Sequence, residues 1–311
     1  MSPARTREST PADAPALAAL WAECFDAPQI AALHALDPDR HRRTFVAEGE
    51  AGALDAVVVW VPRTVRDAHG VPERVGGVGS VATRPSARGR GLVRRLLADA
   101  ERSMTAERCA WSLLFTDTPG VYRGSGWREF PRLSFEGPIA VAGTAPGPCP
   151  VRPATPADAE AVRALHTAYN ADRPLTTVRS AADWALRVPV WYGAPGTALI
   201  AEDPATGEAV GWLVAEYGGE RAEVREFAGR EACLPALFAA VAAGARAAGL
   251  RRAGVHLPDG AGLRTALPAL LAEAAPVEDR TGMARPMLAP AAAVRAVLTA
   301  PGAVHWYGDS F

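Results

Sequence analysis

The chain has 311 residues, of which 49% are hydrophobic, and a net charge of −1. A chain of this length usually folds into about two domains, each with its own core. Its nearly balanced charge argues against a nucleic-acid-binding protein that relies on phosphate contacts.

Cysteine usage and hydrophobic runs narrow the class of protein further. The four cysteines are far apart and form no CxxC pair, which predicts neither a disulfide framework nor a metal site. No apolar run approaches the roughly 18 residues of a membrane span, and Met1 to Arg5 lack the apolar core of a signal peptide. We therefore expect a cytoplasmic protein that binds neither membranes nor nucleic acid.

The first half of the chain alternates between helical and strand patterns. Apolar side chains recur at helical spacing in residues 12–25, and leucines do so in residues 89–106. Between them lie runs that are typical of strands. The predicted elements are helices at 12–25 and 29–40, strands at 43–48, 54–66 and 75–83, a helix at 89–106, a strand at 109–115, a short helix at 119–124 and a strand at 127–136.

The pattern begins again after residues 138–150, whose prolines and glycines are typical of a linker. Val151 to Asp158 opens a helix much as Thr6 to Asp13 does, which indicates a second copy of the same architecture. Its predicted elements are a hairpin at 197–215, a strand at 221–228, a helix at 232–248, a strand at 251–257, a helix at 261–274, a strand at 277–287 and a last helix at 290–298.

Together these elements predict an α/β (α+β) fold of two tandem domains. Each domain is expected to be a mixed central sheet flanked by helices. We expect the first domain at residues 1–137, the linker at 138–150, the second domain at 151–288, and a C-terminal helix and tail at 289–311.

The turn between the predicted strand 75–83 and the predicted helix 89–106 is the most informative segment. It contains Arg88-Gly89-Arg90-Gly91, whose glycines let a ligand approach the backbone without Cβ clashes. The unpaired amides and the dipole at the start of a helix favour a phosphate there. A P-loop is excluded because the chain contains no lysine, and the following residues do not complete a Rossmann motif. The segment predicts an anion site, with a simple turn as the alternative.

The segment from Arg88 to Val93 resembles motif A of the GCN5-related N-acetyltransferases, the GNAT superfamily. Val93 replaces the small residue that usually ends this motif, a form similar to that of the enhanced-intracellular-survival (Eis-like) branch. The resemblance implies two tandem GNAT-like domains, a turn that holds the pyrophosphate of acetyl-CoA, and a preceding strand that binds its pantetheine arm. The implied cofactor-binding residues are Val81, Ala82, Thr83, Arg88, Gly89, Arg90, Gly91, Leu92 and Val93.

The second copy lacks this motif. Its corresponding turn, Arg225 to Ala232, contains one glycine, and Glu226 and Glu231 lie where the resemblance would put the pyrophosphate. Negative charge at a helix start repels a phosphate. We therefore predict one acetyl-CoA site per chain, in an active first domain beside a degenerate second domain that shapes the acceptor pocket.

Tyr122 is the candidate general acid. Transfer of an acetyl group to an amine leaves a CoA thiolate that needs a proton, and a thiol pKa of about 8.5 lies below a tyrosine pKa of about 10. Tyr122 follows the strand predicted beside the motif strand, and the Eis-like family has a tyrosine general acid in a similar run. The alternative is a tyrosine that only packs beneath the cofactor.

Phe311 is the second catalytic candidate. The chain ends in the aromatic-rich segment 305–311, whereas most tails are polar and frayed. The Eis-like resemblance implies that a terminal phenylalanine reaches the active site and that its α-carboxylate acts as the base. Since an α-carboxyl has a pKa of about 3.5, anchoring a cationic substrate or relaying a proton through water is easier to defend. An aromatic tail that packs without chemistry is the alternative.

The resemblance has one departure. Full-length Eis-like proteins carry a third, sterol-carrier-like domain that supplies their terminal residue, so here segment 289–311 would have to reach the site by a shorter path. Trp21, Phe25 and Asp26 end the first predicted helix, which shapes the acceptor pocket in this fold, with core packing or helix capping as alternatives. Further substrate-binding candidates are Trp306 and Asp309, His305 is a candidate proton shuttle, and candidates for the pocket wall are His166, Tyr169, Trp184, Trp191 and Tyr192.

The expected function is an acetyl-CoA-dependent N-acetyltransferase that needs no metal. Its partner would be the amine of a small cationic molecule, aminoglycoside-like or polyamine-like. The alternatives are a non-catalytic acetyl-CoA-binding regulatory module, a mycothiol-synthase-like enzyme whose second half is active, and a protein N-acetyltransferase. The sequence leaves the acceptor and the oligomeric state open.

Overall fold

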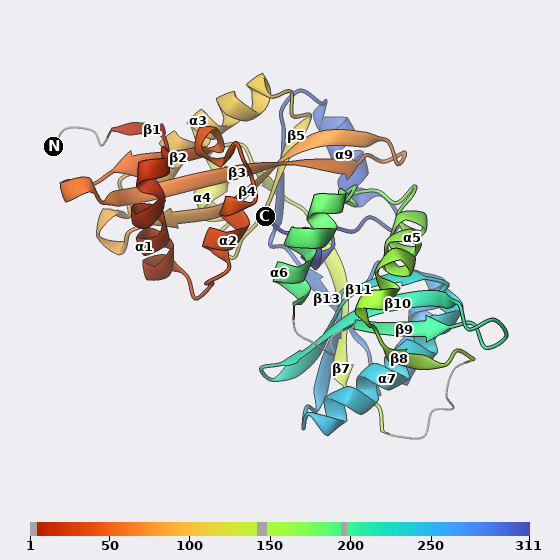
Figure 1. Ribbon diagram of the computed structural model, residues 1–311. Coiled ribbons are helices and arrows are strands. Elements are labelled where there is room, and N and C mark those ends of the chain that lie inside the picture. Colours follow the sequence, from red (N-terminus) through yellow and green to blue (C-terminus); the bar gives the residue numbers. More distant parts are fainter. Residues whose placement is uncertain (1–4, 142–147, 194–197) are drawn as a thin grey trace.

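The structure is a computed structural model that describes residues 5–141, 148–193 and 198–311. These residues form two domains of similar build, each around a seven-stranded mixed sheet (Figure 1). This arrangement confirms the predicted α/β fold of two tandem domains, each with a central sheet flanked by helices.

The first sheet has the order β1-β2-β3-β4-β5-β14-β6. Strands β4 and β5 are parallel, and the other neighbours are antiparallel. Its strands are β1 (Thr6–Glu8), β2 (Thr44–Glu48), β3 (Leu54–Arg66), β4 (Pro72–Thr83), β5 (Trp111–Phe115), β6 (Arg128–Glu129) and β14 (Gly282–Pro286), and its helices are α1 (Ala14–Cys24), α2 (Ile30–Ala35), α3 (Leu92–Ala106) and α4 (Gly120–Arg123).

Strand β3 is apolar along most of its length because helices cover both faces of the sheet. Val57 and Val59 point to one face and pack with residues of α1. Val58 and Trp60 point to the other face and pack with α3. The side chains that α3 buries there recur at helical spacing, and they are Leu92, Leu96, Leu97, Ala100 and Met104.

The second sheet has the order β13-β7-β12-β11-β10-β9-β8, in which β11 and β12 are parallel. It therefore repeats the topology of the first sheet. Its strands are β7 (Arg132–Pro138), β8 (Val151–Pro153), β9 (Ala198–Glu202), β10 (Ala209–Gly218), β11 (Arg221–Gly229), β12 (Arg252–Val255) and β13 (Ala275–Asp279). The helices of this half are α5 (Ala159–Tyr169), α6 (Val188–Tyr192), α7 (Leu234–Ala247) and α8 (Ala261–Ala266), and α9 (Ala291–Thr299) precedes the tail.

The internal repeat extends to side-chain geometry. In each domain an arginine of the first strand binds one aspartate from the turn before the first helix and one glutamate from the next strand. The pairs are Arg7 with Asp13 at 2.7 Å and Glu48 at 2.6 Å, and Arg152 with Asp158 at 2.8 Å and Glu202 at 2.6 Å.

The domains exchange one strand each, which differs from the boundaries expected from the sequence. Residues 127–136 do not form one strand of the first domain, because β6 lies in the first sheet whereas β7 pairs with β12 and β13 of the second. The predicted strand 277–287 also divides, into β13 of the second sheet and β14, which pairs with β5 of the first.

Local breaks in the ladders explain both divisions. Pro131 lies between β6 and β7 and has no N–H with which to continue a ladder. Between β13 and β14, the Asp279 carboxylate accepts a hydrogen bond from the backbone N–H of Thr281 at 2.7 Å, which turns the chain. Residues 132–138 therefore complete the second sheet, and residues 282–286 complete the first.

A further segment connects the domains. The backbone N–H of Val178 donates to the Thr64 carbonyl at 2.8 Å, and that of Leu175 donates to the Arg66 carbonyl at 3.0 Å. Thus the chain between α5 and α6 runs along the end of β3. A helical segment that the sequence did not predict follows it: a π-helical turn at Asp183–Arg187 continues into α6.

The exchanged strands predict that the first domain does not fold alone. A fragment of residues 1–150 lacks β14, so the polar backbone edge of β5 would lose its partner and Met283 would be missing from the core. We expect no cooperative thermal unfolding of this fragment by circular dichroism, whereas the full chain unfolds cooperatively. A fragment with a sharp transition and dispersed amide resonances would contradict the structural role of the exchange.

Candidate active site

The predicted anion turn lies between β4 and α3. Gly89 and Gly91 have φ of +76° and +68°, a left-handed conformation that favours glycine. Gly91 is the residue immediately before α3, and a Cβ at either glycine would meet nothing within 4 Å. The backbone here is therefore open, and the start of a fifteen-residue helix points its unpaired amides to it. These residues fit a phosphate group.

The arginines of this turn are only partly available to a ligand. Arg90 forms an ion pair with Asp55 at 2.9 Å, and the Arg88 Nε donates to the Thr83 carbonyl at 3.4 Å. Both arginines are exposed. Asp55 therefore partly neutralises the positive charge of Arg90. Backbone amides and the helix dipole are therefore the main attraction for an anion here.

Strands β4 and β5 diverge beside this turn. Their pairing ends at Gly77 and Leu113, although β4 continues to Thr83. Beyond that point β4 has a bulge against β3, in which Ser80 has φ of +53°. The indole N–H of Trp21 donates to the Ser80 carbonyl at 3.0 Å. Bulges commonly occur beside active sites and re-aim the backbone.

The C-terminal residue packs on this part of β4. A Cβ at Gly77 would stand 2.3 Å from the Phe311 ring, and a Cβ at Gly79 would stand 2.7 Å from a carboxyl oxygen of Phe311. Real Cβ atoms do not approach so closely, so these two strand positions must be glycine for the tail to lie here. The segment 289–311 thus reaches the first domain (Figure 1).

Aromatic side chains hold the Phe311 ring. It stacks on Phe115, the last residue of β5, with ring centroids 6.2 Å apart, and His305 lies 5.0 Å from Phe115 on the same measure. Burial lowers the pKa of His305 to about 4, so its imidazole is neutral near pH 7. Within the described residues neither of its ring nitrogens has a hydrogen-bond partner, which gives no relay for the proton shuttle considered from the sequence.

Tyr122 lies in α4, at the carboxyl end of β5. Its side chain is buried, 7% exposed, and its ring meets Trp127 edge-on at 6.4 Å. Burial raises the pKa of Tyr122 to about 12, although the nearby Thr116 hydroxyl opposes this shift. Because β4 and β5 are parallel, Tyr122 and the Gly89–Gly91 turn follow strand ends on the same edge of the sheet.

The residues predicted to bind substrate divide into two groups. Phe25 and Asp26 are exposed directly after α1, where an acceptor could contact them. Trp21 is 4% exposed and belongs to the core. Trp306 and Asp309 are 0% exposed. The structure therefore corrects the sequence prediction for these three residues: packing and buried hydrogen bonds occupy them rather than an open pocket.

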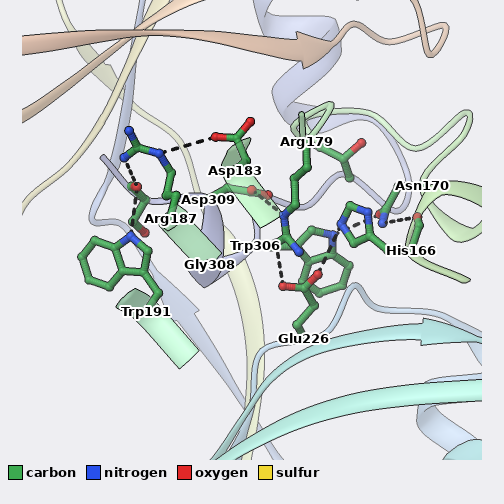
Figure 2. A network of polar contacts seen from close by, with 12 residues as sticks. His166, Asn170, Arg179, Asp183, Arg187, Trp191, Glu226, Trp306, Gly308 and Asp309 are labelled. Carbon is green, nitrogen blue, oxygen red and sulfur yellow. Dashed lines mark hydrogen bonds and ion pairs between the residues drawn. The ribbon is translucent and has the colours of Figure 1, made fainter. Parts of the chain in front are cut away.

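Sequence reasoning missed the glycines that receive the tail and misread Glu226. Glycine is rare in strands, so the run Gly76-Gly77-Val78-Gly79 was the signal for a close approach to β4. Glu226 lies in β11 at 0% exposure and pairs with Arg179, rather than standing at the start of α7 (Figure 2). The pocket-wall candidates His166 and Tyr192 contact this same carboxylate.

No helix in the described part of the chain is long and apolar enough to cross a membrane. No cluster of histidine, cysteine, aspartate or glutamate side chains in those residues could hold a metal ion.

Comparisons with known proteins agree with this geometry. Residues 5–130 match the family described as acetyltransferase (GNAT) domain. No curated protein sequence matches the chain. The structure resembles a probable N-acyltransferase from Enterococcus faecalis, with a TM-score of 0.70 and 16% identity over 91% of this chain and 73% of that one.

Two further solved structures share the fold. A GCN5-related N-acetyltransferase from Sphaerobacter thermophilus has a TM-score of 0.56 and 16% identity, over 93% of this chain and 97% of that one. Eis1 from Mycobacterium abscessus has a TM-score of 0.61 and 12% identity, over 91% and 74%. Residues 5–130 therefore match an acetyltransferase (GNAT) domain, and the chain as a whole shares the fold of GCN5-related N-acetyltransferases.

Proposed function

We propose that this protein is an acetyl-CoA-dependent N-acetyltransferase that acetylates an amine of a small cationic molecule, such as a polyamine or an aminoglycoside-like compound. The observation that carries the proposal is the position of the Phe311 carboxyl group. It lies against Gly79 of β4, in the same domain as the anion turn and beside the bulge, where β4 still pairs with β3 but no longer with β5.

Acetyl-CoA would supply the activated acetyl thioester. The open, left-handed glycines Gly89 and Gly91 and the start of α3 would hold its phosphates. The β4 backbone from Val81 to Thr83 has no partner in β5, so it can hydrogen-bond an extended arm and the thioester oxygen. Ala82 and Leu92 are buried, which leaves their backbones rather than their side chains to contact this ligand.

Tyr122 would provide the proton that the departing sulfur needs. Its raised pKa keeps the phenol protonated at neutral pH, which a general acid requires. Its burial also limits access of competing water.

The Phe311 carboxylate would attract and orient the cationic acceptor. A negative charge beside partly buried aromatic rings interacts more strongly with an amine than it would in bulk water. Proton removal from the ammonium would proceed through this carboxylate or through water bound to it. The same attraction would favour a small cation over a neutral acceptor.

One active domain per chain is part of the proposal. Helix α7 of the second domain begins after Cys233, which is 1% exposed, and its turn has no open glycine pair like that before α3. This difference supports one acetyl-CoA site, in the first domain, over an enzyme whose second half is active.

The first test moves the carboxylate. Adding several residues after Phe311 should lower kcat by more than about tenfold, since positioning supplies much of the rate in such reactions. Thiol release from acetyl-CoA would be measured against a panel of polyamines, aminoglycosides, amino acids and peptides. Acetyl-CoA affinity, measured by calorimetry, should stay unchanged with one site per chain. An N-terminal extension is the control, and undiminished kcat/KM in the C-terminally extended protein would overturn the role of Phe311.

The second test leaves the chain end intact but adds a methyl group in the space that the Phe311 carboxyl group occupies at Gly79. In Gly79→Ala the new Cβ would stand 2.7 Å from the carboxyl oxygen and 3.1 Å from the carboxyl carbon of Phe311. The end of the chain must therefore shift, and we expect kcat to fall by roughly ten- to a hundredfold. Gly218→Ala is the matched control, because a Cβ at that strand glycine meets nothing within 4 Å. Equal activity of the two variants would argue against a positioned carboxylate.

The third test concerns the proton donor. Tyr122→Phe should lower kcat by about 10²–10⁴-fold with little change in acetyl-CoA affinity, as expected for loss of a general acid. In the unaltered enzyme the pKa near 12 means that Tyr122 loses its proton only as pH rises well above 10, so kcat should show no alkaline loss from this group below about pH 10. Tyr217→Phe, a half-buried tyrosine of the second domain, is the control. A loss below about threefold in Tyr122→Phe would make that residue structural.

A further inference from the structure

The second domain holds the tail through Trp306, Gly308 and Asp309 (Figure 2). The Val304 N–H donates to the Pro174 carbonyl at 3.1 Å, and the Trp306 indole N–H donates to Asn170 at 3.0 Å. The Gly308 N–H donates to the Tyr192 hydroxyl at 2.8 Å. The tail is therefore a fixed structural element up to the residues that enter the candidate active site.

A buried ion network is the centre of these contacts. The Arg179 guanidinium donates to Asp309 at 2.8 Å and to Glu226 at 2.8 Å. The three side chains are 1%, 0% and 0% exposed. Burial alone would raise the pKa of Asp309, but its ion pairs with Arg179 and Arg63 outweigh burial and keep that pKa below its usual value. Asp309 is therefore charged when the tail is in place.

The network continues to the first domain and to the residue before Phe311. Arg63 of β3 binds Asp183 at 2.6 Å and lies 3.6 Å from Asp309. The Trp191 indole N–H donates to the Ser310 carbonyl at 3.1 Å, and Arg187 reaches the same oxygen at 3.5 Å. These contacts fix Asp309 and the carbonyl of the peptide bond that leads to Phe311.

The network occupies the part of the second domain that corresponds to the candidate active site of the first. Glu226 is two residues beyond Val224, the last residue of β11 that pairs with β12. Gly79 is likewise two residues beyond Gly77, the last residue of β4 that pairs with β5. Where the first sheet leaves room at a glycine, the second sheet presents a buried carboxylate.

We propose that Arg179, held by Glu226, is a positioning residue that latches the tail through Asp309 and so sets the Phe311 carboxylate against Gly79. Trp191 and Arg187 complete the latch at Ser310. The second domain then serves acetyl transfer in the first domain by holding the last residues of the chain in place. It does so where β11 and β12 of the second sheet cease to pair. The expected effect on rate rests on the proposed function. The contacts that hold the tail do not depend on that function and can be tested without measuring activity.

Two variants test the latch. Asp309→Asn removes the charge that Arg179 binds and keeps the shape of the side chain, and Trp191→Phe removes one hydrogen bond to Ser310 and keeps the ring. Asp158→Asn is the matched control, because it weakens the ion pair with Arg152 in the same domain, at a carboxylate that binds Arg152 and Thr155 rather than the tail. Thermal unfolding of all three variants, of Arg179→Lys, which retains the positive charge, and of Arg179→Met checks that each remains folded.

The first measurement is release of Phe311 by a carboxypeptidase, followed by amino-acid analysis. A latched tail is resistant, and Asp309→Asn should release Phe311 roughly tenfold faster or more, because a locally opened segment is the form that is cleaved. Trp191→Phe should have a smaller effect in the same direction, and Arg179→Lys should restore part of the resistance relative to Arg179→Met. Release at the control rate in both Asp309→Asn and Trp191→Phe would overturn the latch.

The second measurement is kcat, in the full chain and in a chain that lacks Phe311. We expect Asp309→Asn to lower kcat by about ten- to a hundredfold without changing acetyl-CoA affinity, and to have little further effect once Phe311 is deleted. Fully additive losses would show that Asp309 acts through overall stability and would overturn the positioning role. If deletion of Phe311 leaves kcat unchanged, the proposed catalytic role of the carboxylate fails, and the digestion rates alone then decide on the latch.

Discussion

The buried guanidinium of Arg179 fixes the position of the C-terminal tail. It lies between a carboxylate of the second sheet and a carboxylate of the tail, and all three groups are removed from water. Burying charges is unfavourable unless they are paired and hydrogen-bonded, and losing one partner leaves the other uncompensated. If the tail moved away, Arg179 would stay in the interior with one of its two partners gone. The ion network therefore restricts the tail to one position, whatever its net contribution to the free energy of unfolding.

The other end of the tail is fixed by space rather than by charge. Gly77 and Gly79 weaken β4 as a strand, since glycine has no side chain to pack and loses more backbone freedom on folding. In exchange they leave room for the ring and the carboxyl group of Phe311. Only Ser310 separates the anchored Asp309 from Phe311, so little backbone freedom remains between the electrostatic anchor and this seat.

Local patterns in the sequence were sufficient for most of the elements and for the glycine turn before α3. The spacing of apolar residues in α3 and the glycines before it have direct structural consequences, and both the buried stripe and the left-handed turn follow from them. The tandem repeat was likewise legible, because the Thr-Pro-Ala-Asp turn recurs and each copy presents its aspartate to an arginine.

Features that depend on pairing between distant segments could not be predicted in this way. Nothing in residues 132–138 indicates which of two similar sheets they join, because both sheets offer the same kind of open edge. Glu226 has the same limitation: from its neighbours alone it resembles a charge at a helix start, and only the fold brings Arg179 to it from another part of the chain. The proposed role of Phe311 came from a family resemblance, and the glycines that receive it were visible in the sequence but had no partner to explain them.

The two copies of the fold have diverged in complementary directions. The first keeps an open glycine turn before α3 and an unfilled position at Gly79, so ligands and the tail can approach its backbone. In the second, a buried cysteine precedes α7 and a paired carboxylate fills the point where β11 leaves β12. Because each sheet contains a strand from the other half, the copies cannot separate without breaking both ladders. A second domain that is connected to the first by exchanged strands can lack a ligand site of its own and still contribute to the reaction. A segment that it binds keeps a fixed position relative to β4. The tail is the segment that it holds, and the ion network at Arg179 is the means.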